Sequence, residues 1–461
     1  METSIEKKAT WGYLLKFALP TIVSMVVMGT FGIIDMVFVS RLIDPIALAP
    51  VGVVFPFFSF VAAVGFMLGV GGNALVAKKI GEGKEAEARV NFSLIITAAF
   101  VLSVVIGSVG LAAPELILNI LGARGDVRTG ALEYMMPLLY FMPAIILGMA
   151  FNQFLVTEGK AYIVTIVTVI SGLTSAGLNY VFIYLMDMGL GGAALATSIA
   201  YTLPALTGLT YFTFKRSGKL YLVKPKFQIR VLGRASINGA SEMVTMLTTS
   251  VTATFVNNIL ARIDTTDGGG AEAQAAAAIV FSALGVFSAV FIGYSAGVMP
   301  IISYNFGKGD AENLSRVYKN SLRLLGVIAI FSVTMGWLLT NFVISVFDVP
   351  MWCPFHAMFG IYDVRFPIHE MSAMGIRIVT AGFIFFAFNA FSSMMFTALN
   401  NGVVSSILSL GQWGFVIVFL LFLPDRFGVN GVWLSMPFAD LLGISLTIFF
   451  FKKMKKRYKY A

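Results

Sequence analysis

Long runs of apolar residues alternate with short charged or glycine-rich breaks along almost the whole chain. Each run is apolar on every side and about 20 residues or longer, which is typical of helices that cross a bilayer. Several runs exceed the length that a bilayer requires, so tilted or bent helices are expected. The runs predict twelve transmembrane helices, at residues 14–39, 46–77, 91–119, 131–157, 161–186, 193–214, 233–261, 273–304, 320–347, 372–399, 403–424 and 431–451.

The composition excludes a globular enzyme of ordinary domain size. Hydrophobic residues make up 58% of the chain, charged residues make up 12%, and the mean hydropathy is +0.87. A soluble protein could not bury so much apolar surface, so we expect a membrane protein. The first charged segment runs directly into a full-length span, which predicts that no cleavable signal peptide precedes it. The single cysteine, Cys353, has no partner for an intramolecular disulfide.

Three segments of the first half recur in the second half in the same order. Both MGLGGAALATSIA and FGVNGVWLSMPFA share G-[LV]-x-G-x-x-L-[AS]-x-x-x-A, a match specific enough to indicate an internal repeat. The matched segments are residues 188–200 with 427–439, the segment starting at Gly65 with that starting at Gly293, and 151–159 with 394–402.

Six helices per repeat is an even number, so both repeats enter the membrane in the same direction. We therefore expect an all-α membrane protein with two six-helix lobes related by a pseudo-two-fold axis along the membrane normal. The predicted domains are a first lobe at residues 1–214, a cytoplasmic linker at 215–230, and a second lobe with a basic tail at 231–461. In transporters built this way, the substrate site lies between the repeats.

The lysine and arginine residues predict the orientation. With the N-terminus inside, only seven of the 32 basic residues fall on the outer side, so both termini are expected to be cytoplasmic in a multi-pass plasma-membrane protein. The same distribution explains the net charge of +9. The basic residues lie beside anionic lipid headgroups, so membrane lipid is the expected partner and nucleic acid is not.

Three carboxylates fall inside predicted spans, where each costs at least about 2.5 kcal/mol to insert. Asp35 lies late in the first span and is expected to face the cavity between the lobes, where it can exchange a proton or hold Na⁺; pairing with Arg41 is the alternative. Glu242, in the seventh span, lies among small polar residues that suit a hydrated wall, or it pairs with Arg234. For Asp440, in the twelfth span, a structural hydrogen bond and a transport role are equally open.

Neutral polar residues gather in the spans near Asp35. Asn179 and Tyr180 lie in the fifth span and Gln153 lies in the fourth. Such residues also hold helices together in membranes, but their concentration predicts hydrogen-bonding neighbours for a desolvated carboxylate. Asn389, in the tenth span, is a corresponding candidate in the second lobe.

Motifs of soluble enzymes are absent from the sequence. It contains no Walker loop, so nucleotide is not an expected partner or energy source. Its two histidines and one cysteine offer no zinc or haem spacing, and no cofactor is expected. We expect a protein that is not an enzyme.

Several motifs together resemble those of the multidrug and toxic compound extrusion (MATE) transporters over essentially the whole length. They are FALPTIVSMV with FGIIDMVFVSRL, GVGGNALVAKKIGEGKEAEAR, ILGARGDV, the segment from Gln153 to Gly159, LNYVFIY followed by MGLGGAALATSIA, and GVMPIISYNFGKGD. The resemblance implies a twelve-helix, two-lobed exporter that exchanges drugs for Na⁺ or H⁺ by alternating access.

The resemblance also assigns roles to single positions. Asp35 matches the acidic position of the family's first span, Asn179 matches a position that is Asn or Asp in the family, and Glu242 resembles an acidic residue of some branches. These matches imply a coupling site at Asp35, Asn179, Tyr180 and Gln153, with Na⁺ possible at Asp35 and Asn179. Where another branch has a carboxylate in the tenth span, this chain has Asn389. Residues 348–370 depart from the family as a longer, aromatic-rich loop.

The function predicted from these features is secondary antiport of small amphipathic, mostly cationic organic compounds against H⁺ or Na⁺ by a monomer. Alternatives are a flippase for lipid-linked substrates and an exporter of one specific native metabolite. A flippase is expected to carry cationic residues in its cavity, whereas the charges within these spans are acidic. A membrane-embedded prenyltransferase would need aspartate-rich metal motifs, which the sequence lacks.

Overall fold

The computed structural model describes residues 8–43, 47–123, 125–260, 262, 270–347 and 366–460, and within these the chain is helical with no strand. The first half contains α1 (Trp11–Leu42), α2 (Leu48–Gly81), α3 (Glu85–Ala112), α4 (Pro114–Ile120), α5 (Gly125–Tyr140), α6 (Met142–Thr157), α7 (Ala161–Asn179), the π-helix η2 (Tyr180–Leu185) and α8 (Gly189–Phe214). The second half contains α9 (Ile229–Leu260), α10 (Gly270–Lys308), α11 (Ala311–Leu338), α12 (Thr340–Phe347), α14 (Phe366–Ala381), α15 (Phe383–Ala398), α16 (Gly402–Phe427) and α17 (Val429–Tyr458).

The described helices agree with the predicted number of spans. Ten are long and apolar enough to cross a membrane, and the number rises to 12 if each of two bent pairs is counted as one span. The bent pairs are α5 with α6, at 59°, and α14 with α15, at 51°. Residues 348–365 of the predicted long loop lie outside the described residues, and the rest of that loop, from Phe366, belongs to α14.

Four predicted spans are not single helices, which corrects the sequence prediction. The first break, at Ala113, precedes Pro114, whose ring disfavours helical geometry in the preceding residue; Ala113 accordingly has a φ of −140°. The break at Phe141 precedes Pro143 in the first turn of α6. Breaks at Leu339 and Gly382 divide the corresponding helices of the second half.

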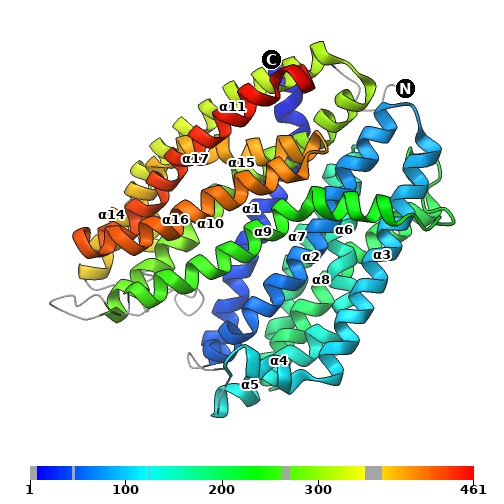
Figure 1. Cartoon of the computed structure of the whole chain (residues 1–461). Helices are drawn as coiled ribbons and strands as arrows, with labels where there is room; N and C mark the ends of the chain where they lie inside the picture. Colours follow the sequence, from blue (N-terminus) through cyan, green and yellow to red (C-terminus); the bar gives the residue numbers. More distant parts are fainter. Residues whose placement is uncertain are drawn as a thin grey trace.

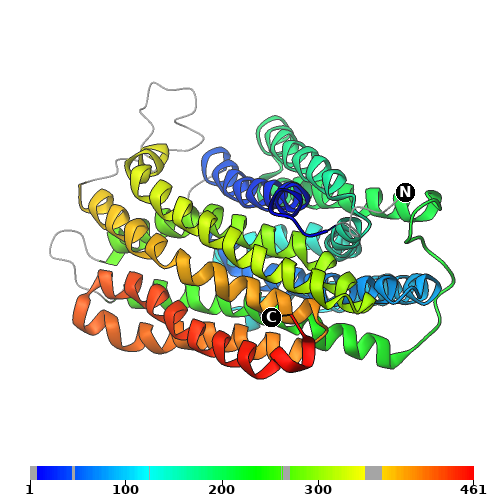
Figure 2. The ribbon, with the colours of Figure 1, turned by 90° about the horizontal axis from the view of Figure 1, so that it is seen from above.

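The helices form two lobes that lie side by side, with both termini at the same end of the molecule (Figure 1). Across the boundary, α1 packs on α10 and α2 packs on α9. In the view from above, the second half, coloured green to red, lies beside the first half (Figure 2).

Reciprocal glycine contacts show how the two halves correspond. A Cβ on Gly81 would collide with the carbonyl of Tyr304, and a Cβ on Gly307 would collide with the carbonyl of Lys78. Such an exchange is expected of two copies related by a two-fold axis. Gly81 is therefore equivalent to Gly307, and Lys78 is equivalent to Tyr304.

The same reciprocity corrects one sequence alignment by two residues. Gly239 of α9 leaves no room for a Cβ beside Met67 of α2, and Gly293 of α10 leaves none beside Ile22 of α1. The two-fold relation exchanges α9 with α1 and α2 with α10, so the two contacts are copies of each other. Gly293 is therefore equivalent to Met67, and not to Gly65 as the sequence match has it. The match of 188–200 with 427–439 stands, because Gly189 and Gly428 both begin it with a φ of +56°.

The segment between α8 and α9 is fastened to the first lobe. The Glu158 carboxylate accepts hydrogen bonds from the backbone N–H groups of Lys219 at 2.8 Å and Leu220 at 3.1 Å. Further along, the N–H of Val223 donates to Ser93 Oγ at 2.9 Å. Burial raises the pKa of Glu158, and the two backbone hydrogen bonds oppose that rise.

Candidate functional site

A cavity of about 640 Å³ lies within the first lobe. Its walls come from α1, α2, α6, α7 and α8, with Phe281 and Ser282 of α10 as the contribution of the second half. The apolar lining includes Met25, Met28, Met36, Met149, Phe31, Phe55 and Phe66, and the polar lining includes Asp35, Asn152, Gln153, Thr168, Ser171, Ser175, Thr197 and Tyr201. The cavity therefore combines a polarisable wall with a single carboxylate.

Asp35 lies on α1 and is half-buried at this cavity. Its Oδ1 atom accepts hydrogen bonds from Ser175 Oγ at 2.9 Å and from Asn179 Nδ2 at 2.8 Å. Ser175 and Asn179 are four residues apart on α7, so they lie on one helix face and reach the same oxygen. Thr197 of α8 lines the same cavity. Two neutral donors from α7 thus bind the carboxylate.

Close packing of α1 on α7 brings these groups together. A Cβ on Gly172 would overlap the ring of Phe31, so only glycine lets the two helices approach this closely. About two turns towards the N-terminus, the Ser24 and Thr165 hydroxyls hydrogen-bond each other at 3.0 Å across the same helix pair. The α1–α7 contact sets the distance between Asp35 and its donors.

The other predicted neighbours of Asp35 are placed differently. Gln153 lines the cavity, and its backbone carbonyl accepts a hydrogen bond from Asn73 at 3.2 Å. Tyr180 is 47% exposed and stacks on Tyr184 with ring centroids 5.1 Å apart, so it does not belong to the cavity lining. The structure does not bring Tyr180 together with Asp35, because adjacent helical residues point about 100° apart and Asn179 already faces Asp35.

A buried oxygen beside Asp35 bears on ion binding. Asn179 is 1% exposed, and its Oδ1 has no hydrogen-bond partner within the part of the chain that the structure describes. A carboxylate and an amide oxygen are suitable ligands for a hard cation. The residues present therefore fit the predicted alternatives of a proton or Na⁺ on Asp35. No group of three or more His, Cys, Asp or Glu that could hold a metal occurs among the described residues.

In the second lobe, Asp440 and Asn389 belong to one buried network. Asp440 Oδ1 accepts a hydrogen bond from Gln412 Nε2 at 2.6 Å, and the Asp440 carbonyl accepts one from Asn389 Nδ2 at 2.8 Å. Asn389 Oδ1 accepts a third bond, from Thr447 at 3.1 Å. These bonds connect α15, α16 and α17. They correspond to the first of the two roles left open for Asp440, a structural hydrogen bond. Neither Asp440 nor Asn389 lines the cavity.

Glu242 is half-buried on α9 and does not line the cavity either. Among the described residues it forms no hydrogen bond and no ion pair, and Arg234 is exposed without contacting it. The predicted alternative of a Glu242–Arg234 pair is therefore not formed. The structure does not bring Glu242 together with Asp440 and Asn389 into one network.

The second lobe has no carboxylate at the position equivalent to Asp35. Because Ile22 and Gly239 occupy equivalent places, Asp35 corresponds to Thr252 on α9. Gly159 and Asn400 have positive φ just before α7 and α16, which shifts the sequence match of 151–159 with 394–402 by two residues. Ser175 and Asn179 therefore correspond to Val416 and Leu420. The repeat therefore carries the carboxylate and both of its α7 donors in the first lobe alone.

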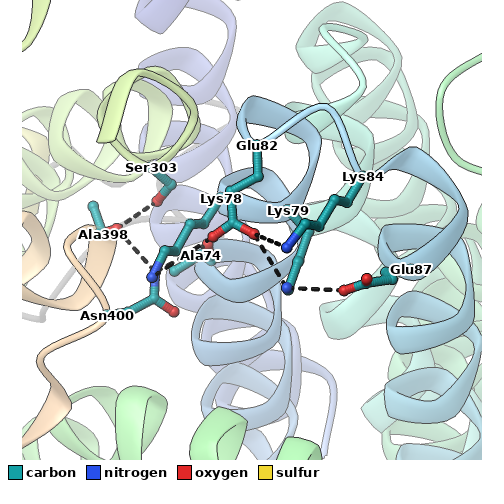
Figure 3. Close-up of polar contacts among 9 residues, drawn as sticks. All are labelled: Ala74, Lys78, Lys79, Glu82, Lys84, Glu87, Ser303, Ala398 and Asn400. Carbon is teal, nitrogen blue, oxygen red and sulfur yellow. Dashed lines mark hydrogen bonds and ion pairs between the residues drawn. The ribbon is translucent and has the colours of Figure 1, made fainter. Parts of the chain in front are cut away.

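At the end that carries both termini, a hydrogen bond joins the lobes (Figure 3). Asn400 Nδ2 donates to the Ala74 carbonyl of α2 at 3.3 Å across the lobe boundary, and within the second half Ser303 Oγ of α10 donates to the Ala398 carbonyl of α15 at 2.9 Å. Beside them, Lys79 Nζ lies 3.1 Å from Glu82 and 2.9 Å from Glu87. The lobes are therefore in direct contact at this end.

The N-terminal segment adds a second connection. The N–H of Ala9 donates to Asn313 Oδ1 at 3.0 Å, and the carbonyl of Ala9 accepts from Asn320 Nδ2 at 2.7 Å. Asn313 and Asn320 lie on α11, whereas Ala9 leads into α1. The first helix of one lobe is thus held against the other lobe.

Sequence reasoning missed Ser175, Thr197 and Phe281. Ser175 precedes Asn179 by one helical turn, so the helical period alone could have identified it. Thr197 and Phe281 come from α8 and α10, and no local pattern in the sequence places them beside α1.

The model of the family described as MatE matches residues 20–181 and 242–422. The chain is 24% identical over 444 residues to the multidrug export protein MepA of Staphylococcus aureus (strain N315), which covers 95% of this chain and 92% of that protein. A crystal structure of MATE in complex with MaL6 superposes with a TM-score of 0.88 at 21% identity, covering 99% of both chains. An outward-facing multidrug resistance MATE family transporter gives 0.86 at 21% identity, covering 97% of this chain and 96% of that one.

Proposed function

Because the chain belongs to the MatE family, whose members are membrane transporters and not enzymes, we propose that it exports multiple amphipathic organic cations in exchange for H⁺ or Na⁺. The observation that carries this proposal is the Asp35 cluster inside the first-lobe cavity. It combines one carboxylate, a set of neutral donors, and a wall of methionine and phenylalanine. A relative that matches 95% of the chain is named as a multidrug export protein, which supports the same function.

The cavity favours a particular class of substrate. A volume of about 640 Å³ can hold a drug-sized molecule. Aromatic faces attract cations, and methionine side chains adapt to different shapes. The one carboxylate, Asp35, favours a positive group on the substrate, because an anion there would be repelled. Flat amphipathic cations meet all three conditions.

Asp35 couples substrate release to the ion. In its ionised form the carboxylate holds a cationic substrate. A proton or Na⁺ arriving from outside neutralises the same oxygen atoms, weakens the hold on the substrate, and favours release outward. After the lobes rearrange, loss of the ion on the inner side restores the charge, so the cycle exchanges one cation for another. Asn179 contributes an amide oxygen to a bound Na⁺ and an N–H donor to the bare carboxylate.

The lobe arrangement supports alternating access. We assign both termini to the cytoplasm from the distribution of basic residues. The hydrogen bonds from Asn400 and Ala9 then close the cytoplasmic side, which is the state expected before substrate leaves outward. In this proposal residues 1–214 and 231–461 are the two moving lobes of a monomer, and 215–230 connects them in the cytoplasm.

The test is efflux of a fluorescent cation from vesicles under an imposed pH gradient and, separately, an imposed Na⁺ gradient. Wild-type protein should respond to one or both gradients, and Asp35→Asn should respond to neither. Glu242→Gln is the matched control, because it removes one carboxylate from a position outside the cavity. Wild-type efflux that ignores both gradients would contradict antiport.

A further inference from the structure

The end of α17 presents a strip of cations on one side. Residues 452, 453, 455, 456, 457 and 459 are lysine or arginine, and all of them are exposed. None forms an ion pair with an acidic residue in the described ranges. The positions Phe449, Lys452, Lys453 and Lys456 are spaced by three and four residues, so they occupy one face of the helix.

The opposite face of this helix end is fixed in an aromatic cluster. Tyr458 and Tyr460 are 7% and 1% exposed. The ring of Tyr460 packs against Tyr318 of α11, with centroids 5.3 Å apart, and against Phe451 at 5.5 Å. Its hydroxyl donates to the carbonyl of Phe451 at 2.8 Å. A basic tail held in this way keeps its cations facing outward.

The turn that allows this contact lies at Lys459. Its φ of +52° is left-handed, and its N–H donates to the carbonyl of Lys455. A left-handed residue directly after a helix commonly reverses the chain and returns the next side chain to the helix. Here the returned side chain is Tyr460, which closes the last turn of α17.

The neighbouring apolar residues indicate the depth of this face in a membrane. Phe449 is 54% exposed and Ile448 is 47% exposed, which is expected where a transmembrane helix faces acyl chains. Lys453 Nζ lies 5.5 Å above the ring of Phe449. The remaining cations follow within about two helical turns, roughly 10 Å further along the axis. We therefore expect these cations at the level of lipid phosphates.

We propose that the outward face of α17, formed by Phe449, Lys452, Lys453 and Lys456, binds the headgroup of an anionic phospholipid. The cations contact the phosphate, and Phe449 contacts the start of an acyl chain. This site is separate from the cavity at Asp35 and does not depend on transport. An acidic protein would satisfy the charges but not the exposed Phe449 beside them, so the lipid is the better match.

The test uses the full-length protein in a neutral detergent with equal amounts of phosphatidylglycerol and phosphatidylcholine. Native mass spectrometry measures the ratio of the two lipids that the protein retains. Wild-type protein should prefer phosphatidylglycerol. The triple variant Lys452→Gln, Lys453→Gln and Lys456→Gln should lose about tenfold or more of that preference.

Two further variants separate a built site from a general excess of charge. Replacing Lys224, Lys226 and Arg230 with glutamine removes the same total charge from a different exposed segment. This control variant should leave the preference for phosphatidylglycerol unchanged. Tyr460→Ala retains every cation but frees the last turn, so it should lower the preference partly.

Several results would overturn the proposal. One is an unchanged lipid ratio in the Lys452, Lys453 and Lys456 triple variant, and another is an equal loss in both triple variants. Full retention in Tyr460→Ala would show a generic basic tail instead of a held face. Displacement of the lipid by excess inorganic phosphate would show that phosphate alone suffices and that the acyl contact with Phe449 is not part of the site.

Discussion

Replacing Asp35 with asparagine should uncouple efflux from the ion gradient while leaving the protein folded. The change keeps the size of the side chain and removes its charge. The oxygen of the new amide can still accept hydrogen bonds from Ser175 and Asn179. Its N–H group can donate to Asn179 Oδ1, which has no partner among the described residues. The local geometry can therefore persist.

The stability change can be worked from these contacts. A hydrogen bond to a charged group contributes about 1.5–3 kcal/mol and a neutral one about 0.5–1.5 kcal/mol, so the two bonds from α7 together weaken by about 2–3 kcal/mol. Removing a carboxylate from a span recovers about 2.5–3.5 kcal/mol. The two effects nearly cancel, so the thermal midpoint of Asp35→Asn should lie close to that of the wild type.

Transport should change far more than stability. A substrate cation about 4 Å from the carboxylate gains about 4 kcal/mol in a partly buried site. Losing that attraction weakens substrate binding by about a thousandfold. Efflux by Asp35→Asn should therefore fall to the level without a gradient.

The assay is efflux of a fluorescent cation from vesicles, with the thermal midpoint measured on the same preparations. Gradient-driven efflux that survives in Asp35→Asn would refute the role of Asp35. If Glu242→Gln abolished efflux while Asp35→Asn and Asn179→Ala were silent, the coupling site would belong to the second lobe.

The remaining predictions concern single contacts. Ser175→Ala removes a donor to Asp35 and should lower the rate of gradient-driven efflux severalfold, whereas Tyr180→Phe should match wild-type efflux; equal losses would contradict the placement of Tyr180 outside the site. Gln412→Leu leaves the buried carboxylate of the second lobe without its donor and should cost about 1–3 kcal/mol of stability, measured as a lower thermal midpoint. Burial raises the pKa of Glu158 above its ordinary value, so this group stabilises the folded state at pH values below the ordinary pKa, and the stabilisation is lost as the pH rises through the folded-state pKa. Glu158→Gln should flatten this part of the curve of thermal midpoint against pH. An unchanged slope would contradict the prediction. A tag placed after Ala461 should react with an impermeant reagent only in permeabilised cells, and labelling of intact cells would reverse the topology.

The sequence by itself determined the membrane architecture. A bilayer requires continuous apolar helices of a set length, so the pattern of runs predicts spans directly, and the described helices agree at ten to 12. The repeat and its two lobes also follow from sequence, because tandem copies retain glycine positions where helices approach closely. A carboxylate such as Asp35 is conspicuous in a span because it is costly there, so the sequence could single it out. The sequence did not show that it lies at a cavity within the first lobe instead of between the lobes.

Only the tertiary structure decided which side chains meet. The side of a helix that faces its neighbour is set by tertiary packing. The structure was therefore needed to show that Asn179 and Ser175 face Asp35, whereas Tyr180 stacks on Tyr184. The breaks within spans depend partly on prolines, which the sequence shows, and partly on contacts between distant helices, which it does not. Phe281, which forms part of the cavity wall, lies more than 240 positions after Asp35 in the chain and belongs to the other half. Hydropathy is local and can therefore be read from the sequence, whereas a site built from six helices exists only once those helices have packed.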